Sequence, residues 1–195
     1  MNLEFDIFKI NHNNIELKQG RILVSGPFLH DIYFSRSVVI LTEHNEKGTV
    51  GFVLNKPLEV SLNDLIEDFP DFNARISMGG PVNADTIHVL HKLGSLVPDS
   101  VHVIDDIFWG GDFDVIKSLI SKNQVLPNEI LFFLGYSGWT TNQLDKEIQE
   151  DSWLVTELSS KEIMSFNKKI WTNTLKKLDN KYKMWENFPE NPSMN

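Results

Sequence analysis

Residues 37–55 read SVVILTEHNEKGTVGFVLN. The two flanking segments, 37–44 and 49–55, are rich in β-branched and apolar side chains, which favour extended backbone. Between them, residues 45–48 (NEKG) have the composition of a turn and end in glycine. The stretch therefore predicts two adjacent antiparallel strands joined by a four-residue loop.

Further strands are expected on both sides of this hairpin, because short apolar runs there are bounded by glycine, proline or polar residues. These runs occupy residues 21–25, 75–78, 86–91, 101–104, 129–134 and 153–156.

Helices are expected where a capping residue precedes apolar residues spaced three or four apart. Ser61 is expected to cap a helix through Phe69, Asp112 one through Ser121, and Thr141 one that contains Leu144 and Ile148. The longest predicted helix covers residues 159–182, with lysines on its outer face.

The strands come in runs rather than alternating strictly with helices, and no internal repeat or low-complexity linker interrupts the chain. This order predicts an α+β fold, as one compact domain with a mixed, largely antiparallel sheet and helices packed on it. We expect an N-terminal arm at residues 1–19, a core at 20–158, and a basic amphipathic helix and tail at 159–195 on the same domain.

Composition restricts the function classes. The 195 residues include no cysteine, which excludes disulfides and thiolate metal sites, and no apolar run is long enough to span a membrane. The beginning of the chain does not resemble a signal peptide, so we expect a cytoplasmic protein. A net charge of −9 disfavours a broad DNA-binding surface, and no helix-turn-helix pattern is present.

Four motifs suggest chemistry, and each also has a structural interpretation. Ser137 lies between a strand and a helix, as a nucleophile would, but Trp139 stands where a nucleophile elbow has glycine; a tight turn is the alternative. His88 and His91 would point to opposite faces of a strand, which disfavours a metal site.

The other two motifs concern anions. Successive amides at Gly79 and Gly80 could form an anion-binding nest, or simply a flexible strand exit. The lysines of residues 159–182 could contact phosphates or anionic lipids, or only solvate a docked helix. We expect no cofactor, no metal site and no catalytic residue.

Several motifs taken in order resemble one family. They are GRIL at 20–23, Asp31 to Val39 (DIYFSRSVV), Glu43-His44, Gly48 to Pro57 (GTVGFVLNKP), GGPV at 79–82, Leu90-His91, Gly135 to Ile148 (GYSGWTTNQLDKEI) and Trp153. This set is similar to the AlgH-like family of bacterial proteins, often labelled putative transcriptional regulators, over roughly residues 20–166.

The resemblance implies a compact mixed α/β protein, and it attaches neither an established activity nor a cofactor. The family usually has alanine where Ser137 stands, which weakens the nucleophile hypothesis further, and glycine where Asn142 stands.

The resemblance also singles out polar residues that a core does not need: Asp31, Arg36, Glu43, Asn55, Gln143 and Glu147. The hypothetical ligand-binding set takes these without Glu43 and adds His44 and the two glycines: Asp31, Arg36, His44, Asn55, Gly79, Gly80, Gln143 and Glu147. The same residues could instead form a buried structural network, in which Arg36 pairs with Glu43 or Glu147. Glu43 and His44 adjoin on a strand, so at most one of them joins a given pocket.

Three functions follow from these observations. The first is a regulatory protein that acts indirectly, through an unknown protein partner or small ligand. The second is a small-molecule hydrolase that uses carboxylates and His44 in a cleft. Arg36, His44 and Glu147 gathered in one cleft would favour an enzyme or a ligand site, whereas the same residues scattered through the interior would favour a scaffold. The third, direct sequence-specific DNA binding, is disfavoured by charge and by the missing motif.

Overall fold

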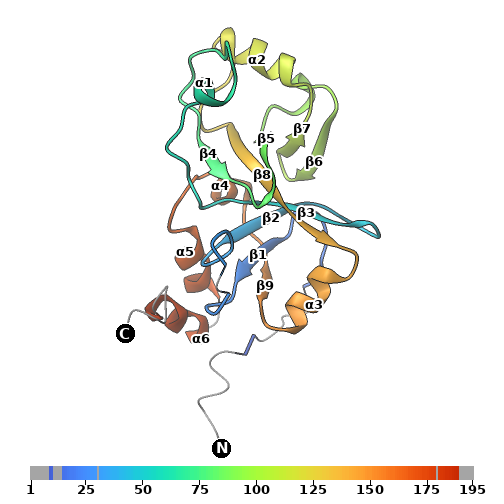
Figure 1. Ribbon diagram of the computed structural model, residues 1–195, viewed down its shortest axis with the longest axis vertical. Helices are drawn as coiled ribbons and strands as arrows, with labels where there is room; N and C mark the ends of the chain where they lie inside the picture. The colour runs from blue at the N-terminus through green and yellow to red at the C-terminus, as the bar shows by residue number, and fades with distance from the viewer. Residues whose placement is uncertain (1–8, 11–14, 30, 179, 189–195) are drawn as a thin grey trace, which may run out of the picture.

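The computed structural model describes residues 9–10, 15–29, 31–178 and 180–188. Most of the expected arm at residues 1–19, and the tail from residue 189, lie outside the described residues. Within them, nine strands form one sheet of order β6-β7-β5-β8-β3-β2-β1-β9, with β4 also paired to β8 (Figure 1). The strands are β1 Ile22–Ser25, β2 Val38–Asn45, β3 Gly48–Val53, β4 Ile76–Met78, β5 Val82–His91, β6 Ser100–Ile104, β7 Ile107–Gly110, β8 Ile130–Thr140 and β9 Trp153–Thr156.

Among the pairings of these described strands, only β4–β8 is parallel, so the predicted α+β fold with a mixed, largely antiparallel sheet is confirmed. The predicted hairpin is confirmed as well: β2 and β3 pair antiparallel, with Val39 opposite Val53. Its loop is shorter than expected, because Asn45 already pairs with Gly48. Gly48 has a φ of 142°, which a side chain would not readily allow.

The longest strand, β8, overturns one expectation. The segment 135–139 was expected as a tight junction between a strand and a helix, but it continues β8 to Thr140. Gly135 takes a φ of 67° within the strand, and a Cβ there would lie 2.7 Å from the carbonyl oxygen of Gly80. Glycine thus lets the strand bend past β5 without ending, a bend that apolar periodicity does not predict.

The helices are short. They are α1 Leu62–Leu65, α2 Phe113–Ser121, α3 Gln143–Gln149, α4 Ser160–Ile163, α5 Ile170–Lys177 and α6 Asn180–Lys183, with 3₁₀ turns at Gly94–Leu96 and Met184–Asn187. Figure 1 shows α1 and α2 at one end of the molecule, and α3, α5 and α6 at the other.

The capping predictions had mixed outcomes. Asp112 caps α2 as expected, and Ser61 caps α1 through a capping box, but α1 ends at Leu65 rather than Phe69. Thr141 does not cap α3; Asn142 takes that position in the left-handed conformation. The hydroxyl of Thr141 instead donates to the carbonyl oxygen of Glu46 and so ties β8 to the hairpin turn.

The single helix expected over residues 159–182 is wrong, because the structure has α4, α5 and α6 there. Phe166 has a φ of 50°, which breaks the helix, and the side chain of Asn167 accepts from the backbone N–H of Lys169 just before α5 begins. The apolar side chains keep a spacing of three to four residues across the break, because each short helix buries its own apolar face against the core. In α5, the indole N–H of Trp171 donates to the carbonyl oxygen of Ser25 in β1.

Candidate functional site

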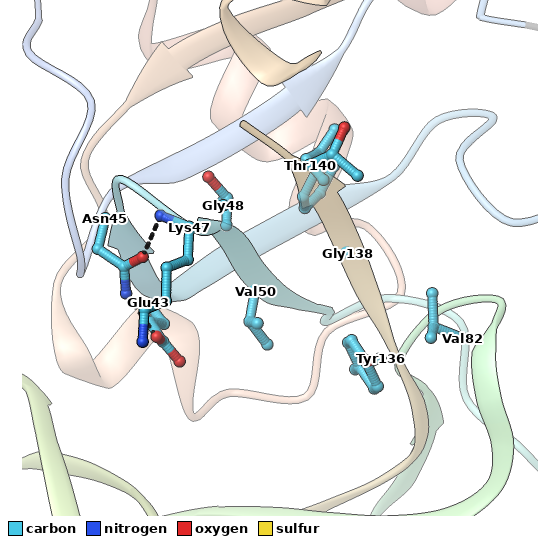
Figure 2. A pocket seen from close by; sticks show the side chains of 11 residues that line it. Glu43, Asn45, Lys47, Gly48, Val50, Val82, Tyr136, Gly138 and Thr140 are labelled. Carbon is cyan, nitrogen blue, oxygen red and sulfur yellow. Dashed lines mark hydrogen bonds between the residues drawn. The ribbon is translucent and has the colours of Figure 1, made fainter. Parts of the chain in front are cut away.

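A groove of about 380 Å³ lies on one face of the sheet, over the ends of β2, β3 and β8 (Figure 2). Two cross-strand rows build this face: Glu43, Val50 and Gly138 lie side by side, and Asn45, Gly48 and Thr140 form the next row. The residues that line the groove are Glu43, Asn45, Lys47, Gly48, Thr49, Val50, Val82, Tyr136, Gly138, Trp139 and Thr140.

A β-bulge places Glu43 in this groove. The register of β2 against β3 shifts by one residue between Leu41 and Glu43, so that Glu43 rather than Thr42 stands opposite Val50. Thr42 is fully buried, and its hydroxyl donates to the carbonyl oxygen of Val50. Without the extra residue, alternation would bring Thr42 to the face that Val50 occupies. The bulge therefore aims a carboxylate at the groove.

The Glu43 carboxylate is held in position from the hairpin turn. The side-chain amide of Asn45 donates to Oε1 of Glu43 over 2.6 Å. The other end of the Asn45 side chain accepts from the backbone N–H of Lys47 over 2.8 Å, the contact drawn dashed in Figure 2. This rim thus carries one oriented carboxylate and, on Lys47, one ammonium group.

The opposite end of the groove is apolar. Figure 2 shows Tyr136 and Val82 across the floor from Glu43. The ring of Tyr136 packs edge-on against His88, with centroids 5.6 Å apart, and His88 in turn packs against Phe52 of the core. Burial lowers the pKa of His88, so the imidazole ring behind Tyr136 favours its neutral form.

A second hollow of about 410 Å³ lies elsewhere on the surface. Ile32 on its edge is 82% exposed. Its lining residues are Ile32, Tyr33, Asn55, Lys56, Pro57, Leu58, Met78 and Lys168.

The structure uses much of the predicted polar set to hold the backbone. Asp31 accepts from the backbone N–H groups of Tyr33 and Phe34 and closes a turn. The side chain of Asn55 donates to the carbonyl oxygen of Arg36 and accepts from the N–H of Val38. Asn55 therefore joins the start of β2 to the segment after β3, and it also borders the second hollow.

Glu147 has partners other than the expected arginine. Its Oε2 accepts from the indole N–H groups of Trp139 and Trp153, and its Oε1 accepts from the side-chain amide of Gln143. The oxygen of Gln143 accepts from the backbone N–H of Thr140, which fixes the start of α3. Gln143 and Glu147 do share a helix face, as their spacing predicts.

The expected ion pair between Arg36 and Glu147 does not form, although the structure describes both residues. The guanidinium of Arg36 donates to the carbonyl oxygen of Phe188 and lies over the ring of Trp171, 5.3 Å from its centroid. The alternative partner, Glu43, lies in the groove instead. Arg36 thus connects the start of β2 to the C-terminal segment. The sequence does not predict this contact, because the helix expected over residues 159–182 is broken.

His44 does not enter the groove. It pairs with Thr49 in the hairpin, one position along from Glu43 and on the other face, and its Nδ1 lies 2.7 Å from the hydroxyl of Thr49. Arg36, His44 and Glu147 therefore have separate partners in separate places. The convergence that would favour an enzyme or a ligand site built from Arg36, His44 and Glu147 is not present among these three described residues.

Gly79 and Gly80 serve a close backbone crossing. A Cβ at Gly79 would lie 2.2 Å from the carbonyl oxygen of Gly135, and one at Gly80 2.4 Å from the backbone of Tyr136. The N–H of Gly79 donates to Leu134, so it is not free for an anion. The hydroxyl of the fully buried Ser137 donates to the carbonyl oxygen of Gly79. Burial and this bond make Ser137 a structural residue rather than an accessible nucleophile.

His88 and His91 differ in environment. His91 is fully buried; its Nδ1 accepts from the backbone N–H of Leu93, and its Nε2 lies 3.1 Å from the carbonyl oxygen of Gly110. These contacts assign the proton to Nε2, and burial lowers the pKa of the ring. Over the described ranges, no three His, Cys, Asp or Glu side chains are grouped closely enough to hold a metal ion.

Sequence reasoning missed most of the groove. It singled out Glu43, and it quoted Gly48 and Gly138 without assigning them to a site. The signal that could have found the groove is Gly138, a glycine that turned out to lie inside a strand on its exposed face. Recognising it requires knowing that β8 continues through residues 135–140.

Fold and groove together define a largely antiparallel α+β protein with a ligand-sized hollow on its sheet. A model of the AlgH-like family matches residues 22–183, and the chain belongs to this family. Curated relatives named UPF0301 protein come from Bacteroides fragilis, 42% identical over 100% of both chains, and Bacteroides thetaiotaomicron, 41% identical over 100% of both.

Two solved structures resemble this one. A Corynebacterium diphtheriae protein matches with a TM-score of 0.74 at 18% identity, over 96% of this chain and 100% of its own, and shows the fold alone. The AlgH protein of Pseudomonas aeruginosa matches with a TM-score of 0.68 at 26% identity, over 85% of this chain and 90% of its own. In the part of the chain that the structure describes, no helix has the length and hydropathy to cross a bilayer.

Proposed function

We propose that this protein works by binding, and that the groove over β2, β3 and β8 is where it takes up a small ligand. Regulation of the kind suggested by the family's usual label would then be indirect, with the ligand or a protein partner acting in place of direct DNA contact. A cytoplasmic location of the protein is part of the same proposal.

The observation that carries the proposal is the contrast between two sets of polar side chains. Asp31, Asn55 and Glu147 are committed to backbone and indole hydrogen bonds within the fold. Glu43, by contrast, is aimed by a bulge into an open groove and oriented there by Asn45. Bulges are frequent beside functional sites, because they redirect one side chain. A hollow of about 380 Å³ is in the range of small-molecule sites.

Charge supports an indirect mode of action. The chain carries a net charge of −9, and nucleic-acid affinity rises with the number of phosphates that cations neutralise. The lysines of the C-terminal segment are in part engaged: Lys176 pairs with Glu186, and Lys177 with Glu162. Direct sequence-specific DNA binding is therefore not part of the proposal.

The test fills the groove with a large side chain and measures whether the protein from cells still carries a bound small molecule. Tagged wild-type protein and Gly138→Trp are purified under gentle conditions from the host, and bound small molecules are identified by native mass spectrometry. Leu126→Trp is the matched control, because Leu126 is 59% exposed and outside the groove. We expect a bound small molecule in the wild type and the control, and its loss in Gly138→Trp. An identical set of bound molecules in all three proteins would contradict the proposal.

A further inference from the structure

Gly138 is unusual among the glycines of this chain. All eleven glycines lie in the described residues, and ten have a conformational or steric reason to lack a side chain. Each of those ten has either a positive φ or a backbone or side-chain atom closer than 3.0 Å to the place of a Cβ. Gly138 has neither: the nearest atoms to its Cβ position would be Cε2 of Tyr136 at 3.2 Å and Cγ2 of Val82 at 3.6 Å.

The fold itself therefore does not require glycine at position 138. Tyr136 is only half-buried, so the end of its ring has room to move by the few tenths of an ångström that a methyl group would need. Glycine inside a strand weakens it, and such a glycine often marks a place where another molecule approaches the backbone closely. Gly138 is exposed on the floor of the groove, where a side chain would occupy the space a ligand needs.

We infer that the groove takes a flat aromatic or heteroaromatic ring that carries an N–H donor, laid on the backbone of Gly138, and that Gly138 determines this specificity. This inference rests on the proposed function and adds the class of ligand. Gly48 in the adjoining row also lacks a side chain, and Val50 lies beside Gly138, so the centre of the floor is backbone and the methyl groups of Val50, with Asn45 and Thr140 at its edges.

The dimensions and walls suit a planar ring. Adjacent strands lie about 4.8 Å apart, so the floor from β2 to β8 is roughly 10 Å across, the scale of a one- or two-ring system. Tyr136 at one end can contact such a ring by its edge or in an offset stack, the two arrangements that aromatic pairs prefer. A puckered saturated ring would touch the same floor with fewer atoms.

Glu43 defines the polar side of the ligand. Its carboxylate accepts hydrogen bonds and donates none, and Asn45 already holds one of its oxygens in place. When a ring lies on the floor of the groove, its N–H meets an oriented acceptor in this carboxylate. Charge-assisted hydrogen bonds of this kind are stronger than neutral ones. The ligand should therefore lose affinity when this N–H is methylated.

The test uses neutral probes that differ in one property each. 2-Quinolone is flat and has an N–H; octahydro-2-quinolone keeps the N–H but is puckered; N-methyl-2-quinolone is flat but has no donor. Binding is followed by the amide chemical shifts of residues 48–50 and 136–140 in the full chain. We expect 2-quinolone to shift these amides and to bind at least tenfold more tightly than either analogue.

Two groove variants and one control variant complete the test. Gly138→Val should weaken 2-quinolone at least tenfold while its melting temperature stays within a few degrees of the wild type. Glu43→Gln should reduce the advantage of 2-quinolone over its N-methyl analogue, since it removes the charge. Leu126→Val, outside the groove, should leave all three affinities unchanged.

Equal binding of the flat and puckered probes, undiminished binding by Gly138→Val, or no shift of the groove amides at saturating probe would overturn the inference. The proposed function fails separately. If no quinolone binds but Gly138→Trp still loses a ligand from cells, the groove is a binding site and only the ring is wrong. If the cellular experiment also shows no difference, both fail.

Discussion

The indole N–H of Trp153 donates to Oε2 of Glu147 over 2.8 Å, and that oxygen also accepts the indole N–H of Trp139. Both rings are nearly fully buried, at 1% and 5% exposure. Glu147→Ala would leave two buried donors unsatisfied, and one such donor costs about 1–3 kcal/mol. We expect a loss of about 2–3 kcal/mol in the free energy of unfolding, measured by urea denaturation. Glu147→Gln keeps an acceptor and should lose clearly less; equal losses would show that the indoles do not depend on it.

Arg36 and Glu147 should behave as independent sites. Arg36 contacts Phe188 and Trp171, whereas Glu147 contacts Trp139, Trp153 and Gln143. In the contacts between described residues these two side chains share no partner, and such residues show additive effects on stability, within about 0.5 kcal/mol. The loss in Arg36→Ala/Glu147→Ala should therefore equal the sum of the two single losses. A coupling of 1 kcal/mol or more between them would mean that the two side chains pair in solution after all.

Acid should destabilise the protein through His91. Burial lowers the pKa of its ring in the folded state, and Nδ1 is occupied by the N–H of Leu93. Below pH of about 6.5, the unfolded chain takes up a proton that the folded ring resists. The contribution of His91 to stability is thus complete above that pH and is lost as the pH falls toward the lowered pKa.

The measurement is the free energy of unfolding at pH 7.5 and at pH 5.5. His88, whose pKa burial also lowers, acts with the same sign. The wild type should therefore lose more stability than His91→Gln over this interval, and His88→Gln/His91→Gln should lose least. Each histidine can contribute at most about 1.4 kcal/mol per pH unit. A slope that is the same in all three proteins would exclude the buried histidines as its source.

The fold was predictable where one local signal dominates. The β-branched runs of β2 and β3 and the cap of α2 at Asp112 need no knowledge of the rest of the chain. Two other segments depended on tertiary contacts. Residues 135–140 look like a turn because they contain two glycines, yet neighbouring strands hold them in β8. Residues 159–182 keep helical spacing across a break at Phe166 that spacing cannot reveal.

The site was less predictable, for the same physical reason. Polar residues such as Asn55 and Glu147 stand out in a sequence, but folding uses them for internal hydrogen bonds. The position of Glu43 in the groove depends on a one-residue bulge. The bulge changes the face of the sheet on which this side chain lies, and the amino-acid composition of the strand does not reveal it. Gly138 stands out only when the space at its Cβ position is compared with that at the other ten glycines, which requires the structure.

The free energy of unfolding of Gly138→Ala tests most directly whether the groove, rather than the fold, requires glycine at position 138. If position 138 is glycine for the sake of the groove, a methyl group there should leave stability unchanged or raise it. Replacing glycine where the backbone permits alanine stabilises by about 0.4–1 kcal/mol. We expect a gain in the free energy of unfolding within that range, or a change near zero, in urea denaturation of the ligand-free protein. A loss of more than about 1 kcal/mol would show that the fold requires this glycine, and would contradict the claim that the groove does.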